Sequence, residues 1–324
     1  MGEFDLIARF FTRPVRRAAL GVGDDCALLA PAPGMQLAVS SDMLVEGRHF
    51  FAGVDPAALG HKALAVNLSD LAACGARPLA FTLALALPRV DEPWLEAFAR
   101  GLLALADEHG CELVGGDTTQ GPLNICITIF GEVPAGQALL RSGAQAGHDI
   151  YVSGTPGEAR LALDALRGQL HLPAATLARL RPRLERPTPR VALGLALRGL
   201  ATSAIDVSDG LLGDLGHVLK ASGVGADIDA FATTDLLASS ACHESATGQI
   251  DQNTLLQCAL AGGDDYELAF SAAPAQRGAV QAAAAASGTP VTRIGRITQE
   301  PGLRLLDRAG QALQGRFASF DHFA

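Results

Sequence analysis

The stretch HKALAVNLSDLAACGARP, residues 61–78, decides the fold of the first half of the chain because it fixes one helix and the end of that helix. Apolar residues recur between Leu59 and Leu71 at the three- and four-residue spacing of a helix with one buried face. Gly75 and Pro78 end the helix, since glycine and proline mark helix C-termini. An apolar run of strand length, Leu79–Leu87, follows directly. The stretch therefore predicts a helix followed by a buried strand.

Helices and strands continue to alternate on both sides of this stretch. We expect helices at Glu3–Phe11, Pro56–Ala76, Pro93–His109, Asp209–Ala221, Asn253–Leu260 and Pro274–Ala286, a helix that begins at Gly157, and a helical region at Pro173–Arg198. We expect strands at Gln36–Ser40, Leu79–Leu87, Cys111–Val114, Asn124–Val133, Asp149–Ser153, Ser203–Val207 and Ala226–Ile228, with two more near the C-terminus. Such a mixture predicts an α/β or α+β fold.

The chain has 324 residues, enough for two domains that each have a core. Pro134–His148 is rich in Gly, Ala and Gln and carries no periodic pattern, so we expect the domain junction there. The predicted domains are residues 1–139 and residues 140–324.

Charge and composition exclude several classes of protein. The net charge is −9, and the clustered basic residues of a nucleic-acid surface are absent. No apolar run is long enough to span a bilayer, and the N-terminus does not have the pattern of a signal peptide. The six cysteines form no CxxC pair, as expected for reduced thiols. We therefore expect a cytoplasmic protein that binds neither nucleic acid nor membrane.

Acidic residues stand beside glycines or hydroxyl residues in six places. These are Asp24–Asp25, Ser40–Asp42 at a strand end, Asn67 with Asp70, Gly115–Thr119 at another strand end, Asp206–Gly210 and Gly262–Asp265. Each alone is compatible with an ordinary turn or helix cap. Carboxylate and hydroxyl oxygens are the ligands that Mg²⁺ prefers, and glycine lets a phosphate approach the backbone. Six such groups in one acidic chain predict a shared metal site.

Asn67 and Asp70 are the least compatible with a structural role alone. They lie one turn apart, on one face of a helix whose other residues are mainly Ala, Leu and Val. An unpaired carboxylate in such surroundings is costly to bury. The spacing indicates that this helix face contributes to the predicted site.

The usual phosphate-binding and hydrolytic motifs are absent. The chain has no GxxxxGK[ST] loop, no HRD/DFG pair, no GxSxG elbow and no HExxH. Its only lysines are Lys62 and Lys220, so metal ions or arginines must neutralise any phosphate-rich ligand. Phosphoryl transfer is compatible with this pattern, because its catalysis rests mainly on positioning and charge neutralisation.

The order of the longer motifs resembles one enzyme family. The motifs are GEFDLI, GVGDDCALL, SSDMLVEGRHF, HKALAVNLSDLAACGARP, VGGDTTQG, RSGAQAG, DVSDGLLGDLGHV and GGDDYEL. In this order they resemble the bacterial thiamine-monophosphate kinases, which belong to the aminoimidazole ribonucleotide synthetase superfamily. The resemblance extends from Gly2 to the closing FDHFA.

The resemblance implies a fold and a reaction. The N-terminal domain would form a β-barrel across a homodimer, and an α/β domain would follow, with ATP between the domains. The reaction would be phosphorylation of thiamine monophosphate to thiamine diphosphate by direct in-line transfer from ATP with several Mg²⁺ ions. No side-chain nucleophile is needed for such a transfer.

The resemblance also implies the roles of individual residues. By position, the magnesium ligands would be Asp25, Ser40, Ser41, Asp42, Asp70, Asp117, Asp206 and Asp209. The ATP contacts would be Gly116, Asp117, Arg141 and Ser208. Thiamine monophosphate would be contacted by His49, Asp264 and Phe317, and the catalytic carboxylates would be Asp42 and Asp117.

Two alternatives stay open at this point. The first is another ATP-using enzyme of the superfamily, acting on a purine precursor, selenide or a carbamoyl group. The selenide and carbamoyl enzymes are disfavoured, because no cysteine precedes Cys26 and the sequence ends in Ala324. The second is a non-catalytic sensor of nucleotide or divalent ion, which is disfavoured because a carboxylate stands at every matching position.

Overall fold

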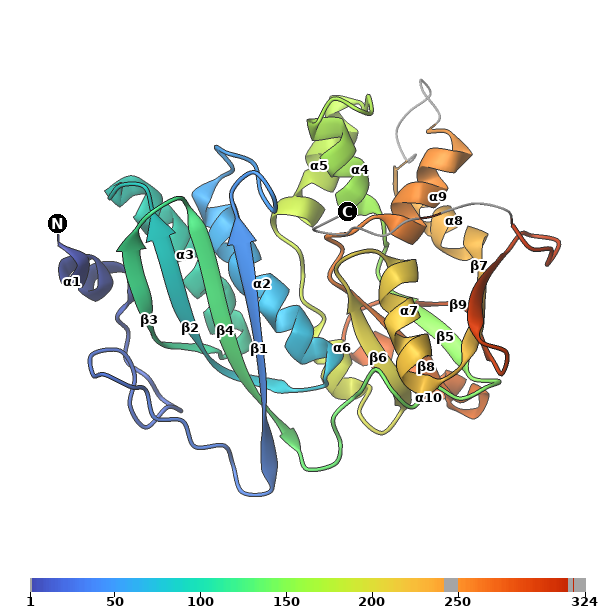
Figure 1. The fold of residues 1–324 in the computed structure, drawn as a ribbon, viewed down its shortest axis with the longest axis horizontal. Helices are drawn as coiled ribbons and strands as arrows, with labels where there is room; N and C mark the ends of the chain where they lie inside the picture. Colours follow the sequence, from blue (N-terminus) through green and yellow to red (C-terminus); the bar gives the residue numbers. More distant parts are fainter. Residues whose placement is uncertain (1, 242–249, 314–316, 318–324) are drawn as a thin grey trace. The chain divides into compact units, whose positions relative to one another are not determined.

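The computed structural model describes residues 2–241, 250–313 and 317 and forms two compact units. Unit 1 comprises Met1–Leu71, Ala76–Ala138 and Glu185–Pro189, and unit 2 comprises Ala72–Gly75, Leu139–Leu184 and Arg190–Ala324. Each unit has one sheet and covering helices (Figure 1). The predicted two-domain, mixed α/β architecture is therefore confirmed.

Unit 1 is a four-stranded sheet in the order β1-β4-β2-β3. Its strands are β1 Met35–Val45, β2 Arg77–Leu87, β3 Glu112–Gln120 and β4 Asn124–Pro134. Its helices are α1 Glu3–Leu6, the π-helix η1 Ile7–Phe11, α2 Pro56–Ala73 and α3 Glu92–His109. Figure 1 shows α2 and α3 together on one face of the sheet.

The faces of this sheet follow from the alternation of side chains along its strands. Phe81, Leu83 and Leu85 of β2 are buried. On the opposite face of the edge strand β1, Val39 and Met43 are 56% and 53% exposed. Unit 1 therefore has one covered and one open sheet face.

Helices α2 and α3 cross with their backbones in contact. A Cβ atom on Gly60 would overlap the carbonyl oxygen of Phe98, and a Cβ atom on Gly101 would overlap the carbonyl oxygen of Ala57. Only glycine allows this approach at the two positions. The crossing fixes α2, which carries Asn67 and Asp70, against the sheet.

Unit 2 is a six-stranded sheet in the order β10-β7-β9-β5-β8-β6, with antiparallel pairs except β10 with β7. The strands are β5 Asp149–Ser153, β6 Ala201–Val207, β7 Gly225–Asp229, β8 Glu267–Ala272, β9 Val291–Thr298 and β10 Gly302–Leu306. The helices are α4 Glu158–Leu166, α5 Ala174–Glu185, α6 Val191–Ala196, α7 Leu211–Ser222, α8 Ala230–Ala241, α9 Gln252–Ala261, the short η2 Pro274–Gln276 and α10 Arg277–Ala286.

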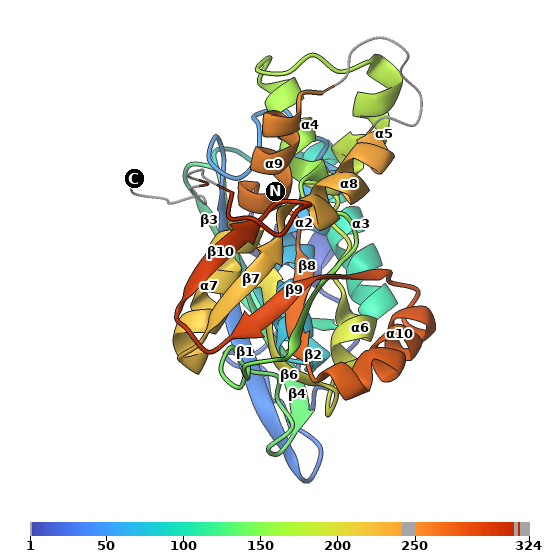
Figure 2. The ribbon, with the colours of Figure 1, turned by 90° about the vertical axis from the view of Figure 1, so that its right-hand side faces the viewer.

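Apolar side chains cover both faces of this sheet. Ile150 and Val152 of β5 belong to a core that also includes Leu215 of α7. On the other face, the rings of Tyr151 and Phe270 stack with centroids 5.2 Å apart. Figure 2 shows α7 on one side of the sheet, and α6 and α10 on the other.

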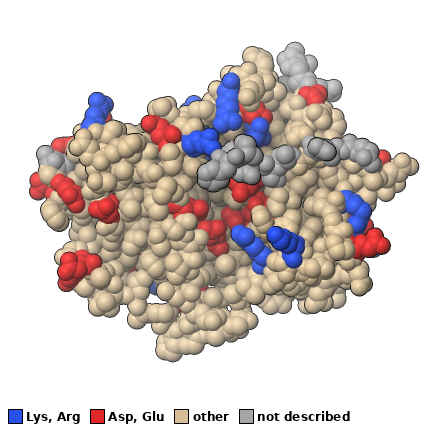
Figure 3. All heavy atoms as spheres, in the orientation of Figure 1, with Lys and Arg blue, Asp and Glu red and all other residues tan. Residues whose placement is uncertain are grey.

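On the face drawn in Figure 3, basic and acidic side chains form small separate groups on a mostly uncharged surface. None of the helices in the described ranges is long and apolar enough to cross a membrane.

Candidate active site

Polar side chains of unit 1 meet between β1 and α2. Ser40 Oγ donates a hydrogen bond to Asp70 Oδ2, and the backbone N–H of Asp42 donates to Asn67 Oδ1 over 3.2 Å. Asn67 is buried and also donates from Nδ2 to the carbonyl oxygen of Ala63. The prediction that Asn67 and Asp70 share one helix face is confirmed, and that face is turned toward β1.

The hydroxyl of Ser41 lies on the other face of the sheet. Its Oγ is 3.0 Å from Thr128 Oγ1 and donates to the carbonyl oxygen of Ile127 over 3.1 Å. Successive side chains of a strand alternate between faces. The structure therefore brings Ser40 and Asp42 toward Asp70, whereas the side chain of Ser41 points away from them.

Asp42 and Asp117 lie inside strands, which corrects the expectation that they follow strand ends. In the ladder, Asp42 stands opposite Ile127, and Asp117 stands opposite Ala84. In both β1 and β3, the apolar residues end before the hydrogen-bonded pairing with the neighbouring strand ends. Both are edge strands with partly exposed side chains, so polar residues continue the ladder without cost.

The two catalytic candidates belong to opposite edges of the sheet. Asp42 and Gly116 occupy one row that passes through Ile127 and Leu83. Three interstrand spacings separate the ends of this row, which is roughly 14 Å. Mg²⁺ binds oxygen at about 2.1 Å. Asp117 is the next residue of β3 after Gly116, so one ion cannot contact both Asp42 and Asp117 within one copy of unit 1.

A pocket of about 470 Å³ adjoins β3 and brings Asp25, Gly116 and Asp117 together. Both carboxylates are exposed. Phe4 and Ile7 are among the residues that form an apolar wall of the same pocket. Three of the predicted ligand residues therefore line one cavity with a polar and an apolar side.

His49 lies in the turn after β1. Its Nδ1 accepts a hydrogen bond from the backbone N–H of Val45 at 3.0 Å, and its carbonyl oxygen accepts one from Lys62 Nζ at 3.3 Å. When Nδ1 is an acceptor, a neutral imidazole carries its proton on Nε2. The half-buried ring is thereby set to act as a donor through Nε2.

In unit 2, the end of β6 and the loop before β8 carry the predicted ligands. Asp206 is the penultimate residue of β6, and Ser208 and Asp209 follow the strand. The backbone N–H of Asp264 donates to the carbonyl oxygen of Ser208 at 2.8 Å. A Cβ atom on Gly263 would lie 2.5 Å from the same oxygen, so the two loops touch through their backbones. The structure therefore brings Asp206, Ser208, Asp209 and Asp264 to one end of the sheet.

Asp214 anchors the first of these loops and was missed by sequence reasoning. Its Oδ2 accepts hydrogen bonds from the backbone N–H groups of Ser208, Asp209 and Gly210, each at 3.1 Å. Burial raises the pKa of Asp214 to about 6, against the lowering effect of these hydrogen bonds. An acidic residue in the first turn of a helix was the available signal.

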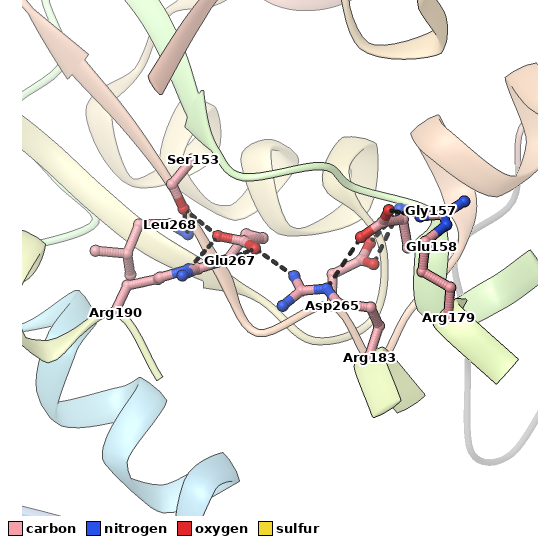
Figure 4. A network of polar contacts seen from close by, with 9 residues as sticks. All are labelled: Ser153, Gly157, Glu158, Arg179, Arg183, Arg190, Asp265, Glu267 and Leu268. Atoms are coloured by element: carbon pink, nitrogen blue, oxygen red, sulfur yellow. Dashed lines mark hydrogen bonds and ion pairs between the residues drawn. The ribbon is translucent and has the colours of Figure 1, made fainter. Parts of the chain in front are cut away.

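Two more buried carboxyl groups follow Asp264: Asp265, which belongs to the predicted acidic group but was given no role, and Glu267, which was missed. Asp265 is 2% exposed and accepts from the backbone N–H of Gly157 with both oxygens at 2.9 Å. Burial raises the pKa of Asp265 well above its usual value, and the Gly157 hydrogen bond opposes this rise. Glu267 is fully buried among Arg183, Arg190 and Ser153, a group that we name the Glu267 cluster (Figure 4).

The other two predicted residues of unit 2 lie outside this group. The carbonyl oxygen of Leu140 accepts from the N–H of Ala204, so the neighbouring Arg141 adjoins the middle of β6. Four residues of strand, roughly 13 Å, separate Ala204 from Ser208. Phe317 is half-buried and packs against the hydrophobic core of unit 2.

The predicted ligands have the donor chemistry that Mg²⁺ requires. They are carboxylates and hydroxyls, and both are hard oxygen donors. Within residues 2–241, 250–313 and 317, no group of three His, Cys, Asp or Glu side chains is arranged to hold an ion. In phosphoryl-transfer enzymes, one or two carboxylates usually share Mg²⁺ with substrate phosphates and water. The residues present fit that type of site.

Comparisons with known proteins match the whole chain. Residues 23–133 match the N-terminal domain of AIR synthase related proteins, and residues 145–308 match the C-terminal domain. The thiamine-monophosphate kinase of Salmonella typhimurium is 48% identical over 100% of this chain and 98% of its own length. The enzyme of the same name from Escherichia coli K12 is 47% identical over the same shares.

Solved structures agree with these relatives. The crystal structure of thiamine-monophosphate kinase from Stenotrophomonas maltophilia matches with a TM-score of 0.83 and 46% identity over 96% of both chains. A structure described as AaThiL complexed with AMPPCP and TMP matches with a TM-score of 0.75 and 27% identity, over 91% of this chain and 89% of that chain.

Proposed function

The chain belongs to the thiamine-monophosphate kinase family of AIR synthase related proteins, and from that membership we propose that it phosphorylates thiamine monophosphate to thiamine diphosphate with ATP. The observation that carries the proposal is the full-length match to the Salmonella typhimurium kinase. A phosphate oxygen of thiamine monophosphate attacks the γ-phosphorus of ATP in line with the bond to the leaving ADP. This transfer uses no side-chain nucleophile.

We infer that several Mg²⁺ ions take part. The proposed ligands are Asp25, Ser40, Ser41, Asp42, Asp70 and Asp117 in unit 1, and Asp206 and Asp209 in unit 2. When bound, the ions neutralise the phosphate charges that would otherwise repel each other and the acidic protein. The distance of roughly 14 Å between the strand positions at the two sheet edges supports several ions rather than one.

The proposed ATP contacts are Gly116, Asp117, Arg141 and Ser208. Gly116 lines the pocket beside β3, and only glycine fits there because a Cβ atom would overlap the carbonyl oxygen of Leu83. The backbone N–H of Ser208 already donates to Asp214, which favours contact with ATP through the Ser208 hydroxyl. Asp42 and Asp117 are the proposed catalytic carboxylates. They lie on β1 and β3, the two edge strands of the unit 1 sheet.

Thiamine monophosphate combines a cationic thiazolium ring with an anionic phosphate, and the proposed contacts suit both. His49 can donate from Nε2 to the phosphate, as its Nδ1 is an acceptor. The Asp264 carboxylate has the charge that attracts the ring. The face of Phe317 can add a cation–π contact of ~0.5–2 kcal/mol.

We further propose a cytoplasmic homodimer in which residues 1–139 pair as a β-barrel and residues 140–324 form the second domain. The open face of β1 supports this assembly, because Leu37, Val39 and Met43 are each more than two-fifths exposed. A sheet with exposed apolar side chains and two unpaired edge strands tends to associate with another chain.

The function is tested by supplying purified protein with ATP, Mg²⁺ and one acceptor at a time. Thiamine monophosphate should give thiamine diphosphate, identified by mass, whereas free thiamine and purine precursors should give no product. Robust turnover of free thiamine, or none of the monophosphate, would contradict the assignment.

A further inference from the structure

The loop that presents Asp264 has an unusual backbone. Asp264 has φ 65° and Tyr266 has φ 51°, and these are the two non-glycine residues with positive φ in the described part of the chain. Bulky residues avoid this left-handed region. The two side chains contact each other, with Tyr266 Oη donating to Asp264 Oδ1 over 3.2 Å. The direction of the Asp264 carboxylate is therefore set by a conformation that the local sequence disfavours.

Alternate residues of the same loop point into the protein. Asp265 is held by the backbone N–H of Gly157, and Glu267 is held by two arginines (Figure 4). Arg190 binds both carboxylate oxygens of Glu267, and Arg183 Nη2 binds Oε1. The buried contacts of Asp265 and Glu267 thus hold the backbone that carries Asp264.

Ser153 completes the attachment. Its Oγ donates to Glu267 Oε2 and accepts from the backbone N–H of Leu268 at 2.9 Å. Glu267 also stands opposite Val207, the last residue of β6, in the strand ladder. The Glu267 cluster therefore fixes the first residues of β8 at the end of the sheet that carries the ligand loops.

The neighbouring loop has its own anchor. Asp214 binds three consecutive N–H groups of residues 208–210, independently of Glu267. Loosening the Glu267 cluster would therefore displace Asp264 more than Ser208 or Asp209. The two ligand loops differ in which buried acid holds them.

We propose that Glu267 and Arg190 are positioning residues that direct Asp264 toward thiamine monophosphate. Neither side chain touches the substrate; both act through the backbone of residues 264–266. The proposal rests on the function proposed above. It predicts a selective loss of affinity for thiamine monophosphate, which a purely stabilising cluster would not produce.

Asp149 provides a matched control within the same sheet. It is a buried carboxylate that is also held by two arginines, Arg277 and Arg293, but it stands at the opposite end of β5. Asp149→Asn and Glu267→Gln each remove one negative charge from a buried carboxylate that two arginines bind. Of the two substituted residues, only Glu267 is next to a loop that carries a proposed ligand, Asp264.

The experiment compares kinetics and binding of the wild type and both variants, well below their melting temperatures. Glu267→Gln should raise KM and Kd for thiamine monophosphate about tenfold and leave KM for ATP within about twofold. Asp149→Asn should change neither. Equal effects on both substrates, an equal effect of Asp149→Asn, or unchanged values in folded Glu267→Gln would overturn the proposal.

Arg190→Lys keeps the positive charge but loses the bidentate contact with the Glu267 carboxylate. This variant tests the proposal if Glu267→Gln does not fold. It should raise KM for thiamine monophosphate about threefold with KM for ATP unchanged. A folded Arg190→Lys protein with wild-type KM would overturn the proposal. Wild-type protein that forms no thiamine diphosphate would remove the proposed function and this inference together, whereas an active wild type with insensitive variants removes the inference alone.

Discussion

Two carboxylate–arginine clusters stand at opposite ends of the β5–β8 strand pair and differ mainly in their exposure to water. Glu267 is bound by Arg183 and Arg190, whose side chains are 20% and 13% exposed. Asp149 is bound by Arg277 and Arg293, whose side chains are 55% and 54% exposed. Both carboxylates are themselves buried. A carboxylate bound by two arginines therefore occurs twice in the sheet, once in a low-dielectric environment and once in a more solvated one.

The difference shows which cluster can hold a strained backbone. Left-handed φ costs a bulky residue such as Tyr266 ~1–2 kcal/mol, whereas an Asp residue such as Asp264 adopts this region more readily. Breaking a buried ion pair costs ~3–5 kcal/mol, whereas exposed pairs contribute ~0–1 kcal/mol. Breaking the Glu267 cluster would therefore cost more than this strain, whereas breaking the Asp149 cluster, whose arginines are exposed, would cost less.

The two carboxylates reach a lowered pKa by different routes. Burial would raise the pKa of Glu267, but the hydrogen bond from Arg190 and the charges of Arg190 and Arg183 outweigh it. For Asp149, the hydrogen bond from Arg277 is the largest cause of the lowered pKa. Both groups are therefore ionised at neutral pH, and each stabilises the fold there.

The largest effect should come from Glu267→Gln. The substitution leaves two largely buried guanidinium groups without a full countercharge, so the free energy of unfolding should fall by ~3–5 kcal/mol. Denaturant titration of both variants measures it. A loss no larger than that of Asp149→Asn would show that burial does not distinguish the clusters.

A smaller loss should follow from Gly154→Ala, which disturbs the same cluster sterically. Gly154 has φ 58°, and an added Cβ would overlap the Glu267 carboxylate. Gly168→Ala is the matched control, because Gly168 has φ 72° and open space around its Cβ position. The control should lose ~1–2 kcal/mol from backbone strain, and Gly154→Ala about twice as much. Equal losses in the two variants would mean that the carboxylate moves aside freely.

The smallest effect should come from Asp149→Asn, and it should depend on pH. Because the folded pKa lies below the ordinary 3.8, the carboxylate stabilises the protein above about pH 4. That stability disappears as the pH falls through the folded pKa. The variant should therefore lose ~1 kcal/mol at pH 7 and approach the wild type in acid. Melting temperatures from pH 7 to pH 3 measure the difference, and a constant gap would contradict the assignment.

The sequence predicted those elements whose apolar pattern matches their length. The predicted helix Pro93–His109 is α3 within one residue at its start, and the predicted strand Leu79–Leu87 is β2 within two. It did not predict the full lengths of β1 and β3, because hydrogen bonding to a neighbour, not apolar residues, extends them. Helix α8 was missed, since its sequence lacks a clear apolar face.

The candidate site was predictable where a local pattern carries it. Asn67 and Asp70 could be placed on one face because both belong to one helix. The Glu267 cluster could not, since Arg190 is 77 residues away in sequence and only the fold joins them. The left-handed conformation of Asp264 also has no local signal, because it is imposed by contacts of its neighbours.

The glycine crossing of α2 and α3 has a consequence for protein engineering. The spacing of the two helices has no room for adjustment, because a single added carbon at Gly60 or Gly101 overlaps the opposite backbone. The position of Asp70 is therefore set partly by α3, a helix that carries no proposed ligand. A library that randomises α3 for stability would displace the proposed ligand Asp70 unless position 101 is held as glycine. Chimaeras between relatives should exchange α2 and α3 as a pair.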